Sequence, residues 1–143
     1  RAVVFLTGVT GLVGQMVLFD LLKQGAAADA EDKEAVVVLV RGKKGKPATD
    51  RLASIRDSPM FRPLRESGAG AGATVTVVEG ELGEEGLGLT RESLSLLTEA
   101  GVTHALHCAA SVSFSDPLAE AAATNVTGAL KVAALVASWP SCG

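Results

Sequence analysis

Hydrophobic and polar positions alternate in blocks along the chain, and the blocks predict strands and helices in turn. Four short apolar runs have the continuous hydrophobicity of strands that are buried on both faces: residues 2–7, 35–40, 73–78 and 102–108. Apolar residues recur at helical spacing from about Leu12, from an N-cap at Thr90 to Ala100, and from Asp116 to about Ser138. This alternation predicts an α/β fold, with a Rossmann-type parallel sheet between helices and the strand order 3-2-1-4.

Three segments lack this regularity. Residues 27–34 read as a polar connection, and residues 68–72 as a flexible link within one domain. The polar stretch 41–65 carries a short helix that we expect to start near Thr49. Because 143 residues suffice for one hydrophobic core, residues 1–143 are expected to belong to a single domain.

Composition excludes several classes of protein. Charged residues make up 20% of the chain and the net charge is −3, which argues against a nucleic-acid-binding surface. Two cysteines are too few for a disulfide scaffold and suit an intracellular, reducing compartment. The uncharged stretch 2–19 has the length of a signal peptide or membrane anchor, but its three glycines, two threonines and Gln15 argue against a membrane span. The first residue is not methionine, so the chain is expected to be a fragment.

The sequence FLTGVTGLVG, residues 5–14, joins the first strand to the first helix and contains glycines at intervals of three. In this strand–turn–helix setting, Gly8 permits a tight turn and Gly11 leaves room for a pyrophosphate. Gly14 lets the helix pack closely, and the helix N-terminus attracts negative charge. The alternative is a merely structural turn. The candidate dinucleotide-binding residues are Thr7, Gly8, Thr10, Gly11, Leu12, Val13 and Gly14.

The second strand ends in a basic segment rather than in a carboxylate. NAD sites place an acidic residue there for the ribose hydroxyls, whereas NADP sites favour arginine for the 2′-phosphate. Here Val40 is followed by Arg41 and then by lysines, so NADPH is the expected cofactor. Arg41 is the main candidate ligand of the phosphate, and Lys43 and Lys44 are weaker ones. A solvated loop is the alternative reading of this cluster.

These motifs resemble the N-terminal part of the fatty acyl-CoA reductases, which belong to the extended short-chain dehydrogenase/reductase superfamily, and of the similar thioester reductase domains. The resemblance covers residues 2–137 and rests on TGVTGLVG, VLVRGKKGK, RLASIRDSPMF, VVEGELGEEGLGLT, HCAASVSFSDPL and TNVTG. It implies the NADP-binding part of a reductase that converts long-chain acyl-CoA to a fatty alcohol through the aldehyde.

The resemblance also assigns further residues. Glu81 and Leu82 occupy the place of an Asp-Leu pair that contacts adenine, and the glutamate departs from that pattern by one methylene. Ala109, Ala110 and Ser111 follow the fourth strand, where small residues leave room for the cofactor. Asn125 matches the catalytic asparagine that supports a proton relay. It shares an apolar helix face with Leu118 and several alanines, so we expect a buried amide with hydrogen-bond partners; a structural amide is the alternative.

Some of the chemistry is missing from the chain. The family's proton donor is a Tyr in a Y-x-x-x-K motif, and the sequence contains no tyrosine. The segment SWPSCG also departs from the family and suggests truncation or a divergent end. Three functions therefore stay open: a fatty acyl-CoA reductase, a thioester reductase domain of a larger synthetase or carboxylic acid reductase, and a non-enzymatic nucleotide-binding module.

Two other kinds of site are rejected. His104, His107 and Cys108 are spaced so that the histidines point to opposite sides of a strand, which argues against a metal site. Ser111 and Ser113 lack the G-x-S-x-G elbow of serine hydrolases.

Overall fold

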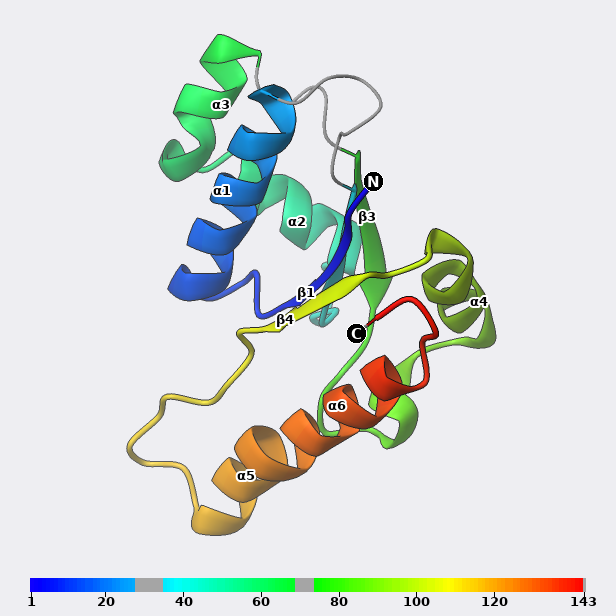
Figure 1. Cartoon of the computed structure of the whole chain (residues 1–143). Coiled ribbons are helices and arrows are strands. Elements are labelled where there is room, and N and C mark those ends of the chain that lie inside the picture. Colours follow the sequence, from blue (N-terminus) through cyan, green and yellow to red (C-terminus); the bar gives the residue numbers. More distant parts are fainter. Residues whose placement is uncertain (28–34, 69–73, 143) are drawn as a thin grey trace.

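The computed structural model describes residues 1–27, 35–68 and 74–142. Its four parallel strands have the order β3-β2-β1-β4, which confirms the predicted class and strand order (Figure 1). They are β1 (Val3–Thr7), β2 (Ala35–Val40), β3 (Thr74–Glu79) and β4 (His104–His107). The predicted connection at 28–34, the link at 69–72 and the start of the third strand at Ala73 lie outside the described residues.

The strand register brings the carboxyl ends of the central strands to one edge of the sheet. Thr7, the last residue of β1, pairs with Leu39 of β2 on one side and with His107 of β4 on the other. The turn that follows β1 therefore lies between the ends of β2 and β4. This is the position where open parallel sheets bind ligands.

One face of the sheet is covered by α1 (Leu12–Ala27), α2 (Ala48–Arg56) and α3 (Arg62–Ser67) (Figure 1). Alternate strand residues such as Leu6 and Val38 are fully buried against Leu18 and Leu22 of α1. The polar stretch after β2 folds into more structure than the single predicted helix. It contains α2, the 3₁₀ turn η1 (Pro59–Phe61) and α3, because the buried side chains of Leu52, Phe61 and Leu64 anchor each piece to this layer.

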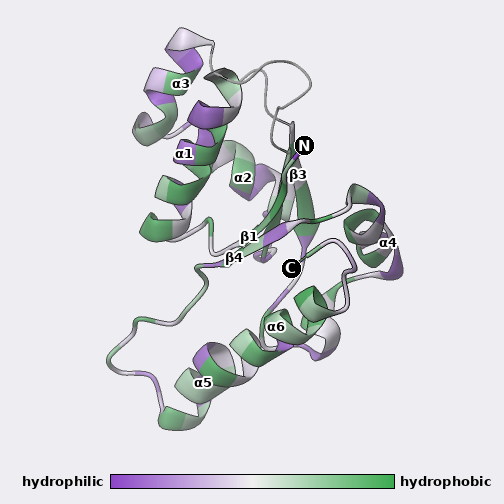
Figure 2. Ribbon diagram, in the orientation of Figure 1, coloured by the Kyte–Doolittle hydropathy of each residue, from purple (hydrophilic) through white to green (hydrophobic). Residues whose placement is uncertain are grey.

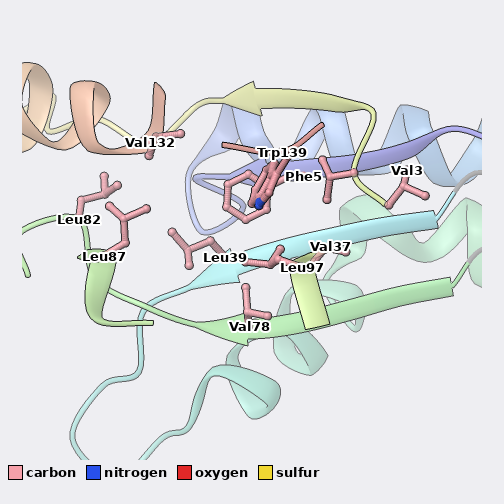
Figure 3. Close-up of a cluster of buried hydrophobic side chains, with 11 residues drawn as sticks. Val3, Phe5, Val37, Leu39, Val78, Leu82, Leu87, Leu97, Val132 and Trp139 are labelled. Carbon is pink, nitrogen blue, oxygen red and sulfur yellow. The ribbon is translucent and has the colours of Figure 1, made fainter. Parts of the chain in front are cut away.

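The opposite face packs against α4 (Arg91–Ala100) and α6 (Ala129–Ala137), as Figure 3 shows. Phe5 of β1 and Trp139 meet edge to face, with ring centroids 5.3 Å apart. Trp139 is 5% exposed and Cys142 packs beside it, so residues 138–142 close this core. The N-cap predicted at Thr90 is confirmed, since its hydroxyl oxygen accepts a 3.1 Å hydrogen bond from the Ser93 N–H.

The last helix differs from the continuous one that was predicted. It begins at Leu118, after Pro117, as α5 (Leu118–Ala122), widens into the π-helical segment η4 (Ala123–Gly128), and continues as α6. A Cβ on Gly128 would lie 3.3 Å from the Leu82 side chain, so the glycine permits close packing of η4 on the loop after β3. Periodicity alone does not show this, because a π-helical turn inserts one residue into an otherwise regular pattern.

Apolar side chains are also exposed on α1, on β4, in residues 112–126 and on α6. The exposed set comprises Leu12, Val13, Met16, Leu106, Val112, Phe114, Leu118, Val126 and Leu130. Figure 2 shows the hydrophobic colour along α5 and α6. Within the described ranges, no helix combines the length and the apolar character that a membrane crossing requires.

Candidate functional site

The turn between β1 and α1 is shaped by contacts of its backbone with the end of β4. Gly8 has φ +82°, and a Cβ there would lie 2.5 Å from the backbone nitrogen of Ala109 and from the carbonyl carbon of Cys108. A side chain is therefore excluded twice, by backbone strain and by lack of space. The predicted role of Gly8 in a tight turn has this physical basis.

The other two glycines of the motif are in different surroundings. A Cβ on Gly14 would lie 2.2 Å from the carbonyl oxygen of Gly8, so α1 packs directly on the backbone of the turn. A Cβ on Gly11 would have one neighbour within 4 Å, the Gly8 oxygen at 3.5 Å. Gly8 and Gly14 are thus required by the fold, whereas the space beside Gly11 is open.

A cleft of about 450 Å³ begins at this turn and runs along the carboxyl ends of the strands. Most of the predicted cofactor-binding residues line it: Thr7, Gly8, Thr10, Gly11, Arg41, Glu81, Leu82, Ala109, Ala110 and Ser111. Leu12, Val13, Gly14 and Lys44 do not. Leu12 and Val13 are exposed in the first turn of α1, and Lys44 lies in a tight turn closed by the Lys43–Lys46 bridge. The lining also includes Arg51, Asp116 and Thr124, which the sequence analysis did not single out.

Thr7 connects the ends of β1 and β4 below the cleft. Its side chain is fully buried, its hydroxyl oxygen accepts a 3.3 Å hydrogen bond from the Ala109 N–H, and it lies 2.7 Å from Nδ1 of His107. Burial lowers the pKa of His107, which favours the neutral imidazole beside this hydroxyl. The contact fixes the backbone of Ala109 against Gly8. Because the register of β1 and β4 creates it, no local sequence pattern could have revealed it.

At the far end of the cleft, Arg41 is held by two neighbours. Its guanidinium lies 3.3 Å from the Glu81 carboxylate, and its carbonyl oxygen accepts a hydrogen bond from the guanidinium of Arg51. The loop that follows is anchored by Glu79, whose carboxylate accepts a 3.1 Å hydrogen bond from the Ala48 N–H at the start of α2. The lining of the cleft at this end therefore contains two guanidinium groups, of Arg41 and Arg51, and one carboxylate, of Glu81.

Asn125, in the π-helical segment, binds the loop after β4 through both atoms of its amide. Its Oδ1 accepts a 2.8 Å hydrogen bond from the Ser111 N–H, and its Nδ2 donates to the Ser111 carbonyl at 2.9 Å. The expectation of partners is met, but the expectation of burial is wrong, because Asn125 is exposed. The apolar side chains near it, Val126 and Leu118, are exposed as well, so nothing in the described chain covers this face.

Ser111 also connects Asn125 to Asp116. The Ser111 hydroxyl donates to Asp116, and hydrogen bonds from Ser111 and Ser113 hold the pKa of that carboxyl below its usual range. The result is a charged carboxylate at the edge of the cleft, fixed to the loop that forms its wall.

The part of the chain that the structure describes contains no candidate metal site. No group of three or more His, Cys, Asp or Glu side chains there could hold an ion. His107 is engaged with Thr7, and His104 lies 2.9 Å from the Thr103 hydroxyl. Both cysteines are free thiols.

Comparison with known proteins identifies relatives over most of the chain. Residues 6–142 match the NAD-binding family described as male sterility protein. The chain is 30% identical over 129 residues to the Drosophila melanogaster protein "Fatty acyl-CoA reductase wat". The matched region covers 90% of this chain and 24% of that protein. It is 31% identical over 123 residues to fatty acyl-CoA reductase 1 of Xenopus laevis, covering 86% of this chain and 23% of the relative. The chain thus spans about a quarter of the length of these relatives.

A solved structure with the same fold comes from a multidomain synthetase. The reductase domain of a nonribosomal peptide synthetase from Mycobacterium tuberculosis is 26% identical and superposes with a TM-score of 0.66, over 94% of this chain and 30% of that one. The resemblance to fatty acyl-CoA reductases and thioester reductase domains is confirmed by these matches. The chain belongs to the NAD-binding family described as male sterility protein.

Proposed function

We propose that these residues form the cofactor-binding part of an NADPH-dependent reductase of long-chain acyl-CoA thioesters. The observation that carries the proposal is the difference among the three glycines of the turn. Gly8 and Gly14 are packed against backbone, whereas Gly11 opens onto the cleft. A turn that is only structural could carry a larger residue in place of Gly11, whereas a pyrophosphate that approaches the backbone there requires a glycine.

The residues present fit a dinucleotide. The cleft volume of about 450 Å³ is in the range of small-molecule sites, and one end is formed by main-chain groups at the start of α1. Gly11 and Thr10 would bind the pyrophosphate, Glu81 and Leu82 would flank the adenine, and the Ala109–Ser111 segment would bind the nicotinamide half. When bound, the cofactor supplies a hydride to the thioester carbonyl.

NADPH rather than NADH is proposed because arginine follows β2. Arg41 lines the cleft at the place where the ribose 2′-position of a bound dinucleotide is expected. A guanidinium binds phosphate through two parallel hydrogen bonds, which a ribose hydroxyl does not use in the same way.

Asn125 would act as a positioning residue for this site. By bonding both the N–H and the carbonyl of Ser111, it fixes the loop that forms the nicotinamide end of the cleft. The proton donor that the family resemblance implies is a tyrosine, and these 143 residues contain none. We expect the isolated 143 residues to show no acyl-CoA-dependent oxidation of NADPH, since general acid catalysis contributes about 10²- to 10⁴-fold. Turnover by these residues alone would contradict the assignment.

A thioester reductase acting on a carrier-bound acyl group is the second candidate, favoured by the likeness to a synthetase reductase domain. The distinguishing experiment offers the protein that contains this span both forms of one long-chain acyl group, as the CoA thioester and as the phosphopantetheine thioester of a carrier protein. Oxidation of NADPH is followed by the loss of its near-ultraviolet absorbance, and the two rates are compared at equal protein concentrations. Faster reaction with the CoA form supports the proposal, and reaction confined to the carrier-bound form supports the alternative. Absence of NADPH binding in a calorimetric titration would reject both and leave a module without this cofactor.

A further inference from the structure

The outer edge of the sheet has a hollow of its own, between β3 and α4. It is a groove of about 670 Å³, lined by Thr76 of β3 and by side chains along one side of α4. Figure 1 shows α4 beside β3, which is the last strand at this side of the sheet. The groove and the cofactor cleft share no lining residue, so the proposed function does not explain the groove.

The side of α4 that lines the groove is charged at both ends and apolar between them. Leu96 and Ala100 line the groove and also pack against the hydrophobic core. Arg91, the first residue of α4, and Glu99, in its last turn, are exposed, and Ser95 lies halfway between them. Because residues four apart lie on the same side of a helix, these three form one stripe, positive at one end and negative at the other.

Both charges of the stripe are unfavourable for the helix that carries them. A helix has a partial positive charge at its N-terminus and a partial negative charge at its C-terminus. Arg91 adds a cation to the positive end, and Glu99 adds an anion to the negative end. The ion pairs of the described residues involve Arg41 and Arg62, so neither end of the stripe has an oppositely charged partner among those residues. The described chain therefore does not account for the stripe.

A second copy of α4, packed antiparallel to the first, supplies the missing partners. A two-fold axis beside Ser95 places Arg91 of each copy opposite Glu99 of the other, because each lies four residues from Ser95. Each arginine then also lies at the negative end of the neighbouring helix, and each glutamate at the positive end. Glu92, the other charged residue of the lining, comes opposite Thr98 and meets no like charge.

We propose that the α4 groove is a self-association surface, at which two copies of the protein pair through antiparallel α4 helices and two Arg91–Glu99 ion pairs. The inference is independent of the proposed function. Among the described strands β3 pairs with β2 alone, so the other edge of β3 is free beside the groove. A second copy at this place would also cover a sheet edge of the kind that folded proteins protect.

Sedimentation velocity over a range of protein concentrations measures the dissociation constant of the dimer, in the protein that contains this span. Arg91→Glu and Glu99→Arg each turn both ion pairs into like-charge contacts, so each is expected to raise the constant by at least about 10-fold. Combining the two substitutions re-forms the pairs with exchanged charges and should return the constant to within about 3-fold of the wild-type value. Arg91→Gln removes the pairs without adding repulsion and should have a smaller effect than Arg91→Glu. Arg62→Glu reverses a charge in α3, outside the groove, and should leave the constant unchanged.

Three results would overturn the inference. The first is a wild type that stays monomeric at every concentration, and the second is a dimer that neither charge reversal weakens. The third is a dimer that both reversals weaken and their combination does not restore, since the two side chains then do not pair across the axis. Calorimetric titration with NADPH separates this inference from the proposed function. Because the groove shares no residue with the cleft, every variant should bind NADPH as the wild type does. Absence of NADPH binding in a wild type that dimerises through α4 would reject the proposed function alone.

Discussion

Backbone contacts form one end of the cleft, and charged side chains form the other end. At the end formed by the glycine turn, backbone contacts decide the geometry, since Gly8 and Gly14 leave no room for a Cβ atom. At the arginine end, flexible side chains meet through one ion pair and one hydrogen bond between Arg41, Glu81 and Arg51. In the proposed function, the first end accommodates the pyrophosphate of the dinucleotide, and the second end selects NADPH over NADH.

This difference has an energetic consequence. Backbone atoms that are packed in a turn cannot move aside, so a change at the glycine end acts first on folding. Exposed charged side chains contribute little to stability, because water and salt screen them. We therefore expect a change at the arginine end to act on ligand binding and to leave the fold intact.

Gly14→Ala provides the largest expected effect. Its Cβ would lie 2.2 Å from the Gly8 carbonyl oxygen and 2.8 Å from the Val9 nitrogen, so α1 would have to move away from the turn. We expect a loss of at least about 3 kcal/mol in the free energy of unfolding, measured by urea denaturation.

Gly11→Ala is the matched control in the same motif. Its Cβ would contact the Gly8 oxygen at 3.5 Å, an ordinary van der Waals distance, so stability should be almost unchanged. Cofactor binding should nevertheless weaken, because the methyl group would enter the space proposed for the pyrophosphate. Equal destabilisation by the two substitutions would remove the distinction between a glycine of the fold and a glycine of the ligand.

Arg41→Glu tests the arginine end. It replaces the ion pair with Glu81 by two carboxylates and reverses the charge that would meet the 2′-phosphate. We expect NADPH to bind about 100-fold more weakly, with a much smaller change for NADH, by fluorescence titration. The melting temperature should change little, since the Arg41 side chain is mostly exposed. Equal losses for both cofactors would contradict the assignment of Arg41 to the phosphate.

The sequence predicted most of the fold because its strands are continuous apolar runs. Residues of β1 and β2 are buried on both faces, and this requirement is visible in the letters AVVFLT and AVVVLV. The glycine turn was predictable for a related reason, since Gly8 and Gly14 satisfy backbone constraints that few other residues can meet. The positions of such residues can therefore be recognised from the sequence around them.

The parts that were not predicted depend on contacts between distant segments. Arg51 reaches the cleft because α2 packs beside the end of β2, and Thr7 meets His107 because β1 and β4 are in register. The burial of Asn125 was predicted wrongly from helix periodicity. Periodicity shows which residues share a face, but whether another element covers that face is decided by the tertiary structure.

Asn125→Ala should have an intermediate effect, which concerns the loop that follows β4 and lines the cleft. The substitution removes the hydrogen bonds to the backbone N–H and to the backbone carbonyl of Ser111. Because both of these groups can bind water when the amide is lost, we expect a loss of about 1 kcal/mol in stability. Asn125→Asp retains an acceptor for the Ser111 N–H and places a carboxylate near the Ser111 carbonyl, so it should not restore full stability. Wild-type stability in both variants, by urea denaturation, would show that this clamp does not hold the loop.

The smallest expected effect is a dependence of stability on pH at the glycine end. Burial lowers the folded-state pKa of His107 below the ordinary value of 6.5. Between these two values the unfolded chain binds more protons than the folded one, so stability that is present above pH 6.5 is lost as the pH falls through the folded-state pKa. We expect a change of less than about 1 kcal/mol, because water screens a partly exposed ring. Urea denaturation of the wild type and of His107→Gln at several pH values measures it. The stability difference between the two proteins should shrink or reverse as the pH falls, since the variant lacks this titration. A difference that stays constant across this range would show that protonation of His107 does not oppose its contact with Thr7, and that the β1–β4 end of the turn is held by backbone contacts alone.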